Sequence, residues 1–229
     1  MKPALIRQHV DSAPPGLLAE WLEARGIPYE VSRSWLGGPL PEPSDYAFVV
    51  SLGHTSGPHD THDPAVVAEL ELLRGAVERD VPVLGLCFGG EALAAVLGAR
   101  VERSPAPELG WRQIETDDPE AIPAGPWLEW HFERFATPPG ATEIARTGDA
   151  TQVFRLGPHL AVQFHPEATV EIVEGWAEHD GVAAALAASR ERREAARAAA
   201  FQLFDAFVAA HASGGSIPKA VRQLARPEG

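Results

Sequence analysis

Apolar positions along this chain follow two alternating patterns, one typical of buried strands and one typical of helices. Short runs of branched apolar residues predict strands at 4–10, 29–31, 46–51 and 81–86. Longer segments with apolar residues at helical spacing lie between and after these runs. They predict helices at 15–25, 64–79, 91–97, 169–178 and 182–212.

Residues that begin or end helices stand at the predicted boundaries. Gly26 follows the first helix, and Gly98 follows the third. Asp63 precedes Pro64, which gives the second helix a capping side chain and a proline at its first position. Segment 36–45 is rich in proline and glycine, and we expect it to form a loop.

The order of these elements predicts an α/β fold with a mainly parallel central sheet covered by helices on both faces. Between residues 99 and 163 the strands are shorter and turn residues are frequent, which indicates a smaller antiparallel edge. The expected arrangement is three-layered and flavodoxin-like. In such a sheet, reactive groups gather at the carboxyl ends of the strands.

Length and charge limit the classes of protein that this chain can be. We expect its 229 residues to form a single domain, 1–229, with a C-terminal helix at about 182–212. A net charge of −13 argues against nucleic acid or an anionic membrane as a partner. No run is long enough to span a membrane, and the N-terminus leads directly into a strand, with no signal-peptide pattern.

Cys87 is the only cysteine, and it stands where the strand at 81–86 breaks into a glycine-rich turn. Gly85 and Gly89 permit a sharp turn, and an alanine-rich helix follows, so the segment predicts a nucleophile elbow built on sulfur. A lone cysteine in an apolar run is more often a small buried hydrophobe. A catalytic thiol also favours a reducing cytoplasm, which is the location that we expect.

A second segment supplies the partners that a catalytic cysteine needs. Residues 161–167 read A-V-Q-F-H-P-E, a short apolar strand that ends at His165, with Glu167 two residues later. Together with Cys87 these residues satisfy the nucleophile, base and orienter roles of a triad. Cys87 and His165 both follow predicted strands, so we expect them to meet at the same edge of the sheet.

These segments resemble the class I (triad) glutamine amidotransferases. The family pattern G-x-C-x-G-x-Q stands here as G-L-C-F-G-G-E at 85–91, and Q-F-H-P-E stands at 163–167. Segments 108–111 and 130–132 resemble strands in the middle of the family's domain. The resemblance runs from about residue 4 to about residue 174, in the family's order.

The resemblance implies further site residues. An oxyanion hole would use the backbone N–H of Phe88 and that of Gly53, where S-L-G-H at 51–54 replaces the family's S-G-G-P. The family segment like 130–132 meets the substrate's α-carboxylate through its backbone. His131 and Phe132 are therefore candidate substrate-binding residues, although we expect the His131 side chain itself to be structural.

Glu91 departs from the family, which has a glutamine at this position. A carboxylate there would repel the α-carboxylate of glutamine and could instead accept a hydrogen bond from an α-ammonium group. A glutamate at this place is also similar to γ-glutamyl hydrolases, relatives that share the triad. Alternatively, Glu91 is an acidic residue in the first turn of a helix, where the helix dipole favours it.

A histidine-rich loop looks at first like a metal site. His54, His59 and His62 lie close together with two aspartates, but their spacing matches no standard zinc pattern. A solvated loop beside the active site is the better interpretation. We therefore expect neither a metal nor a cofactor.

The predicted function is release of ammonia from glutamine, or a related γ-glutamyl amide, through a cysteine thioester. The predicted alternative is a γ-glutamyl hydrolase that acts on a small conjugate. A binding module that kept the fold without turnover is a third possibility, against which the intact triad argues. Family members usually pass ammonia to a synthase domain, so a separate synthase subunit is a possible partner.

Overall fold

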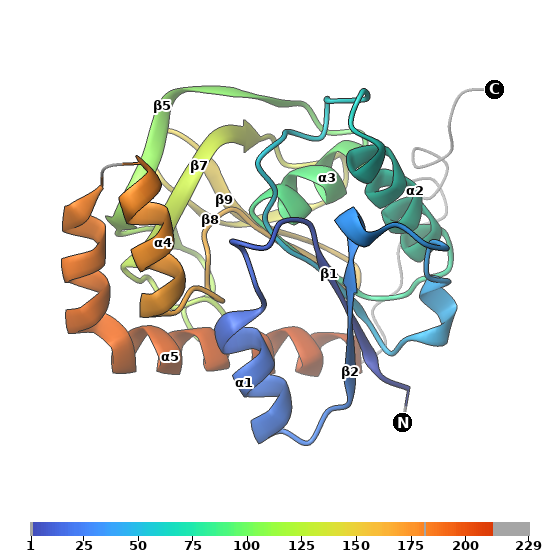
Figure 1. Cartoon of the computed structure of the whole chain (residues 1–229), viewed down its shortest axis with the longest axis horizontal. Coiled ribbons are helices and arrows are strands. Elements are labelled where there is room, and N and C mark those ends of the chain that lie inside the picture. The colour runs from blue at the N-terminus through green and yellow to red at the C-terminus, as the bar shows by residue number, and fades with distance from the viewer. Residues whose placement is uncertain (1, 181, 213–229) are drawn as a thin grey trace.

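The computed structural model describes residues 2–180 and 182–212. Figure 1 shows a central twisted sheet with helices on either side. The helices are α1 (Gly16–Ala24), α2 (Pro64–Glu78), α3 (Phe88–Val96), α4 (Val170–Asp180) and α5 (Ala183–Ala212), and two short 3-10 helices span Ser34–Leu36 and Pro43–Asp45.

An eight-stranded sheet forms the middle layer, in the order β2-β1-β3-β4-β10-β9-β8-β6. Its members are β1 (Ala4–Gln8), β2 (Tyr29–Arg33), β3 (Val49–Ser51), β4 (Val83–Leu86), β6 (Glu115–Thr116), β8 (Thr142–Arg146), β9 (Thr151–Leu156) and β10 (His159–Val162). The strands from β2 to β10 pair in parallel, whereas β9, β8 and β6 extend the sheet in antiparallel pairs. The predicted α/β fold and its antiparallel edge are therefore confirmed.

Alternate residues of each central strand face opposite layers, which explains why both faces of the sheet are covered. Ile6 of β1 packs into a cluster with α1 and α5, and the neighbouring Leu5 packs into a cluster with α2 and α3. The first part of the long α5 stands beside α4, and its later part runs along the lower side of the molecule next to α1, although α1 and α5 are far apart in the sequence (Figure 1). Its buried Leu203, Phe204 and Phe207 anchor it to that face.

Two strands lie outside the central sheet and form an antiparallel ribbon, which the sequence did not distinguish. They are β5 (Val101–Arg112) and β7 (Trp127–Phe135), and their register shifts between Arg103 and Glu108. The sequence placed only short strands in this region. The ribbon carries Trp130, His131 and Phe132 toward the end of the sheet where Cys87 lies.

Several boundaries differ from the predicted ones: the strand predicted at 4–10 ends at Gln8, the one at 29–31 extends to Arg33, and the one at 81–86 begins at Val83. The third helix begins at Phe88 rather than 91, because Cys87 alone takes up the turn from strand to helix. The strand predicted at 46–51 is limited to Val49–Ser51. Asp63 caps α2 as expected, since its side chain accepts a hydrogen bond from the N–H of Ala65 at 2.8 Å.

No helix within the described residues is long and apolar enough to cross a membrane.

Candidate active site

The turn that holds Cys87 has a strained backbone and very close chain contacts. Cys87 has φ +52° and ψ −114°, a conformation that non-glycine residues rarely adopt. Its N–H donates to the carbonyl of Val162 at 2.8 Å, which ties the turn to β10. A side chain on Gly85 would collide with the backbone of Gly89, and one on Gly89 would collide with Ser51. The glycines on both sides of Cys87 thus allow the elbow that the sequence predicts.

His165 reaches the same place from β10. Val162 pairs with Leu86 in parallel register, so the chain after each strand emerges at the same edge of the sheet. The backbone N–H of His165 donates to the carbonyl of Leu128 at 2.9 Å. Its Nδ1 lies 2.7 Å from Oε1 of Glu167, so Nε2 is the ring nitrogen that the predicted triad assigns to the thiol of Cys87.

The charge around His165 favours its protonated form. Burial of the ring works against a positive charge, but the negative charges of Cys87 and Glu167 and their hydrogen bonds outweigh burial and raise the pKa of His165 well above its usual range. The ring also packs edge-on against Trp176, with 4.8 Å between ring centres. A nearby cationic imidazole is one of the surroundings that make a cysteine reactive.

The expected oxyanion donors border this arrangement. Phe88 is the first residue of α3, so its N–H has no acceptor within the helix. Gly53 lies against His165, since a side-chain carbon on Gly53 would be 3.3 Å from Cε1 of the imidazole. The roles of Phe88 and Gly53 as donors stay predictions.

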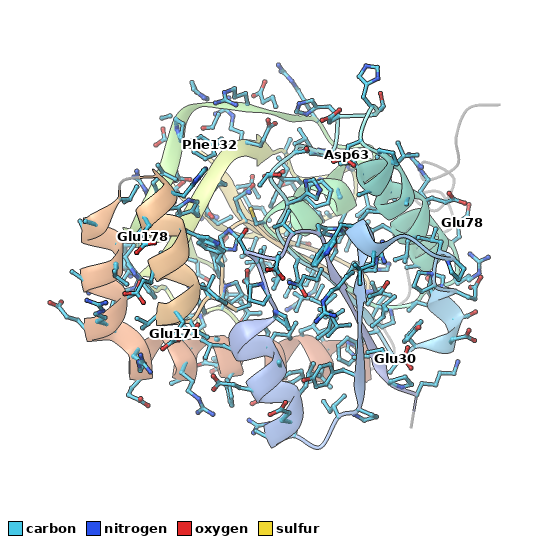
Figure 2. All side chains as sticks on the ribbon, in the orientation of Figure 1. Glu30, Asp63, Glu78, Phe132, Glu171 and Glu178 are labelled. Carbon is cyan, nitrogen blue, oxygen red and sulfur yellow. The ribbon has the colours of Figure 1, made fainter. Side chains whose placement is uncertain are left out.

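A cavity of about 600 Å³ opens at Cys87 and His165. Most of its wall is apolar, and its polar side chains include three histidines. The lining residues are Val10, Ser12, Ala13, Gly53, His54, Thr55, Cys87, Trp130, Phe132, His165, Gly175, Trp176 and His179. Phe132 is 39% exposed and lies in the upper part of the molecule, as does Asp63 just before α2 (Figure 2).

Glu91 does not line this cavity. Its carboxylate is buried and accepts a hydrogen bond from Nε2 of Gln163 at 2.9 Å. Burial raises the pKa of Glu91 to about 7, an effect that the hydrogen bond from Gln163 partly offsets. A contact between Glu91 and substrate stays a prediction. The hydrogen-bond partner of Glu91 in the structure is Gln163, a residue of the second sequence motif.

The side chain of His131 is buried behind the cavity wall, in a cluster of charged groups. Its Nδ1 lies 2.7 Å from the carbonyl oxygen of Glu133, and its Nε2 lies 3.2 Å from carboxylate oxygens of both Glu108 and Glu129. Burial opposes the charged imidazole, yet the two carboxylates raise the pKa of His131 to about 10. The His131 side chain therefore belongs to this buried charged cluster, as expected of a structural residue. Its neighbour Phe132 lines the cavity.

Metal-like spacing occurs in this buried cluster and not in the histidine-rich loop. Among the residues that the structure describes, Glu108, Glu129 and His131 form the one group whose ligand atoms lie within 4.8 Å of one another. The cationic His131 already compensates the charge there. In the loop, Nδ1 of His54 accepts the N–H of Ser56, and His59 is exposed 3.7 Å from Glu133.

Sequence reasoning missed part of the cavity wall. Trp176 and His179 come from α4, and Ser12 and Ala13 come from the loop after β1. The position of that loop at the carboxyl end of a central strand was the available signal. The residues of α4 carried no signal, because their helical pattern indicated only packing.

Comparison with known proteins agrees with this geometry. The family model for "Glutamine amidotransferase class-I" matches residues 55–174, more than half of the chain. The chain belongs to the class I glutamine amidotransferase family. The match includes both Cys87 and His165.

Relatives of known sequence and structure extend the similarity beyond that segment. The amidotransferase-like protein YfeJ of Salmonella typhimurium is 30% identical over 190 residues, which cover 76% of this chain and 79% of that protein. A GMP synthase (glutamine-hydrolyzing) of Aeropyrum pernix is 32% identical over 178 residues, 70% of this chain but 33% of the synthase. This family member thus spans about a third of that synthase.

A solved structure has nearly the same extent as this chain. The crystal structure of a glutamine amidotransferase from Methylobacillus flagellatus superposes with a TM-score of 0.85 at 26% identity. It covers 95% of this chain and 97% of its own.

Proposed function

We propose that this amidotransferase hydrolyses the γ-amide of glutamine, or of a related γ-glutamyl compound, through a thioester on Cys87. The observation that carries the proposal is a strained cysteine at a cavity that it shares with a His165–Glu167 pair, whose Nδ1···Oε1 distance is 2.7 Å. Membership in a family of glutamine-dependent enzymes supports the same chemistry.

The proposed reaction has two halves, formation of the thioester and its hydrolysis, and the same groups act in both. The Cys87 thiolate attacks the amide carbon, and the N–H groups of Phe88 and Gly53 stabilise the oxyanion. As the C–N bond breaks, His165 gives its proton to the departing nitrogen. His165 then takes a proton from water, which attacks the thioester and releases glutamate and the free thiolate. Glu167 holds the imidazole in the orientation that both transfers require.

The identity and fate of the released nitrogen compound, ammonia or an amine, distinguish two forms of this proposal. In the first, a separate synthase subunit receives ammonia, and the similarity to part of a GMP synthase supports this form. In the second, the protein acts alone as a γ-glutamyl hydrolase on a small conjugate, which the size of the cavity supports. A binding module without turnover is less consistent with a strained cysteine beside a cationic histidine.

The proposal is tested by trapping the acyl-enzyme. Purified protein is incubated with glutamine and with γ-glutamyl amides, quenched in acid and analysed by mass spectrometry. We expect a glutamyl adduct on the peptide that contains Cys87, which is unambiguous because the chain has no other cysteine.

Release of glutamate is measured in parallel with the Cys87→Ser variant. We expect its turnover to fall by at least about 1,000-fold, as for other nucleophile deletions, with an unchanged melting temperature. Wild-type turnover in Cys87→Ser, or an adduct elsewhere, would show that Cys87 is not the nucleophile.

A further inference from the structure

The cavity beside Cys87 is larger than the reacting group of glutamine needs. Its volume is about 600 Å³, within the range of pockets that enclose whole drug-sized ligands. The scissile carbon must lie at Cys87, and the departing nitrogen must lie within hydrogen-bond reach of His165. The position of His165 therefore shows on which side of the site any substituent of that nitrogen would lie.

Aromatic side chains occupy that side. The ring of Trp176 packs against His165 with 4.8 Å between centres, and the ring of Trp130 lies 5.6 Å from that of Trp176. The indole N–H of Trp176 donates to the carbonyl of Ser12 at 2.8 Å, which fixes the ring over the cavity. A group attached to the departing nitrogen would extend across these rings.

Apart from its histidines, the described part of the same wall offers no charged side chain to a substituent, and His165 gives its own proton to the departing nitrogen. None of the cavity-lining residues that the structure describes is a lysine, arginine, aspartate or glutamate. Burying an ammonium or carboxylate there would carry a desolvation cost without an ion pair to offset it. An apolar substituent would instead gain from leaving water.

We propose that the departing group is a primary arylalkylamine, so that the preferred substrate is an N-γ-glutamyl arylalkylamine instead of free glutamine. This inference rests on the proposed function, whose thioester chemistry it keeps. The Cys87 sulfur bonds to the γ-carbon, the C–N bond breaks, and the amine leaves with the proton of His165. Water then cleaves the thioester to give glutamate.

The test compares kcat/KM for three substrates of the full chain: glutamine, γ-glutamyl benzylamide and the charged conjugate γ-glutamyl-4-aminobutyrate. Burial of the phenyl ring predicts a preference for the benzylamide over glutamine of roughly 10- to 100-fold. Trp176→Ala should reduce the ratio of benzylamide to glutamine turnover by about 10-fold, the loss expected for one well-packed ring. The ratio cancels any general effect of the substitution on His165.

Two further variants separate packing from folding. Trp176→Phe keeps an aromatic ring and should retain most of the preference. Trp35→Ala removes an exposed tryptophan outside the cavity and should leave the ratio unchanged.

The outcomes distinguish this inference from the function on which it rests. Hydrolysis of glutamine or of the charged conjugate at least as well as the benzylamide would overturn the inference and leave the thioester chemistry intact. An unchanged ratio in folded Trp176→Ala would overturn it as well. Absence of both glutamate release and a Cys87 adduct with every substrate would refute the proposed function itself.

Discussion

At the scale of single residues, His165 depends on the negative charges on either side of it. Burial alone would favour the neutral ring, and the charges of Cys87 and Glu167 together with their hydrogen bonds reverse that preference. In the proposed mechanism Glu167 is therefore more than a support for the ring, because it helps to keep on His165 the proton that the departing nitrogen needs.

Glu167→Gln keeps the shape of the side chain and removes its charge. The pKa of His165 should fall, so the alkaline limb of the kcat/KM profile should move to lower pH, with maximal activity reduced by roughly 10- to 100-fold. The profile of glutamate release between pH 5 and 10 measures both effects. Glu171→Gln on the exposed face of α4 is the matched control and should leave the profile unchanged. An alkaline limb at the wild-type position would show that Glu167 does not set the charge of His165.

Glu91 links pH to stability. Its pKa rises from the usual 4.5 to about 7 in the folded protein because the carboxyl group is buried. Between these values the unfolded chain has lost the proton and the folded chain has kept it, so stability falls as pH rises and then levels off above about 7.

Glu91→Gln should remove this pH dependence while it keeps an acceptor for Gln163. The difference in free energy of unfolding, variant minus wild type, should become more positive by on the order of 3 kcal/mol as the pH rises from 4.5 to 8. Urea denaturation at several pH values gives this difference, with the exposed Glu71→Gln as control. A difference that stays constant with pH would show that Glu91 is ionised throughout in the folded protein.

At the scale of secondary-structure elements, the elbow joins β3, β4 and α3 at distances that only glycine permits. Gly85 on β4 faces the backbone of Gly89, and Gly89 on α3 faces the backbone of Ser51 on β3. Backbone atoms cannot move aside as a flexible side chain can. The helix can therefore begin immediately after Cys87 and present the Phe88 N–H to the site.

Gly85→Ala should destabilise the fold by more than about 2 kcal/mol, as overpacking against a rigid backbone does. Gly75→Ala is the matched control: it lies inside α2, where its new methyl group would meet the end of the Arg79 side chain at 3.2 Å. Alanine in a helix should stabilise this position by roughly 0.5–1 kcal/mol. Chemical denaturation of both variants checks the prediction, which equal stabilities would contradict.

At the scale of the whole molecule, α5 covers one face of the sheet although the strands β1, β3 and β4 under it lie far away in the sequence. Phe204 is fully buried, and its ring packs against Trp21 of α1 with 5.5 Å between centres. One side of α5 thus completes the core, while its alanine-rich first half supports α4 beside the active site.

Phe204→Ala should lower the free energy of unfolding by about 3–5 kcal/mol, because it leaves a cavity between α1, α5 and the sheet. Phe201→Ala, on the same helix, removes a half-buried ring that lies under the guanidinium of Arg197 and should cost clearly less. Denaturant titration of both variants gives the comparison. Equal losses would mean that α5 is not held mainly through its buried stripe.

The sequence by itself determined the fold class and the chemical centre. Alternating apolar patterns predicted the covered parallel sheet, and two local motifs predicted the elbow at Cys87 and the pair at His165 and Glu167. These features depend on residues close together in the chain, where spacing and glycine content already restrict the backbone.

Only the tertiary structure decided what surrounds that centre. It paired Glu91 with Gln163, joined β5 and β7 into a separate ribbon, and brought Trp176 from α4 against His165. Each of these contacts joins two separate segments of the sequence. The apolar pattern of each segment predicted only a helix or a strand, and it gave no sign of the partner segment. Which side chains meet across such distances depends on how the layers pack, and no local spacing encodes it.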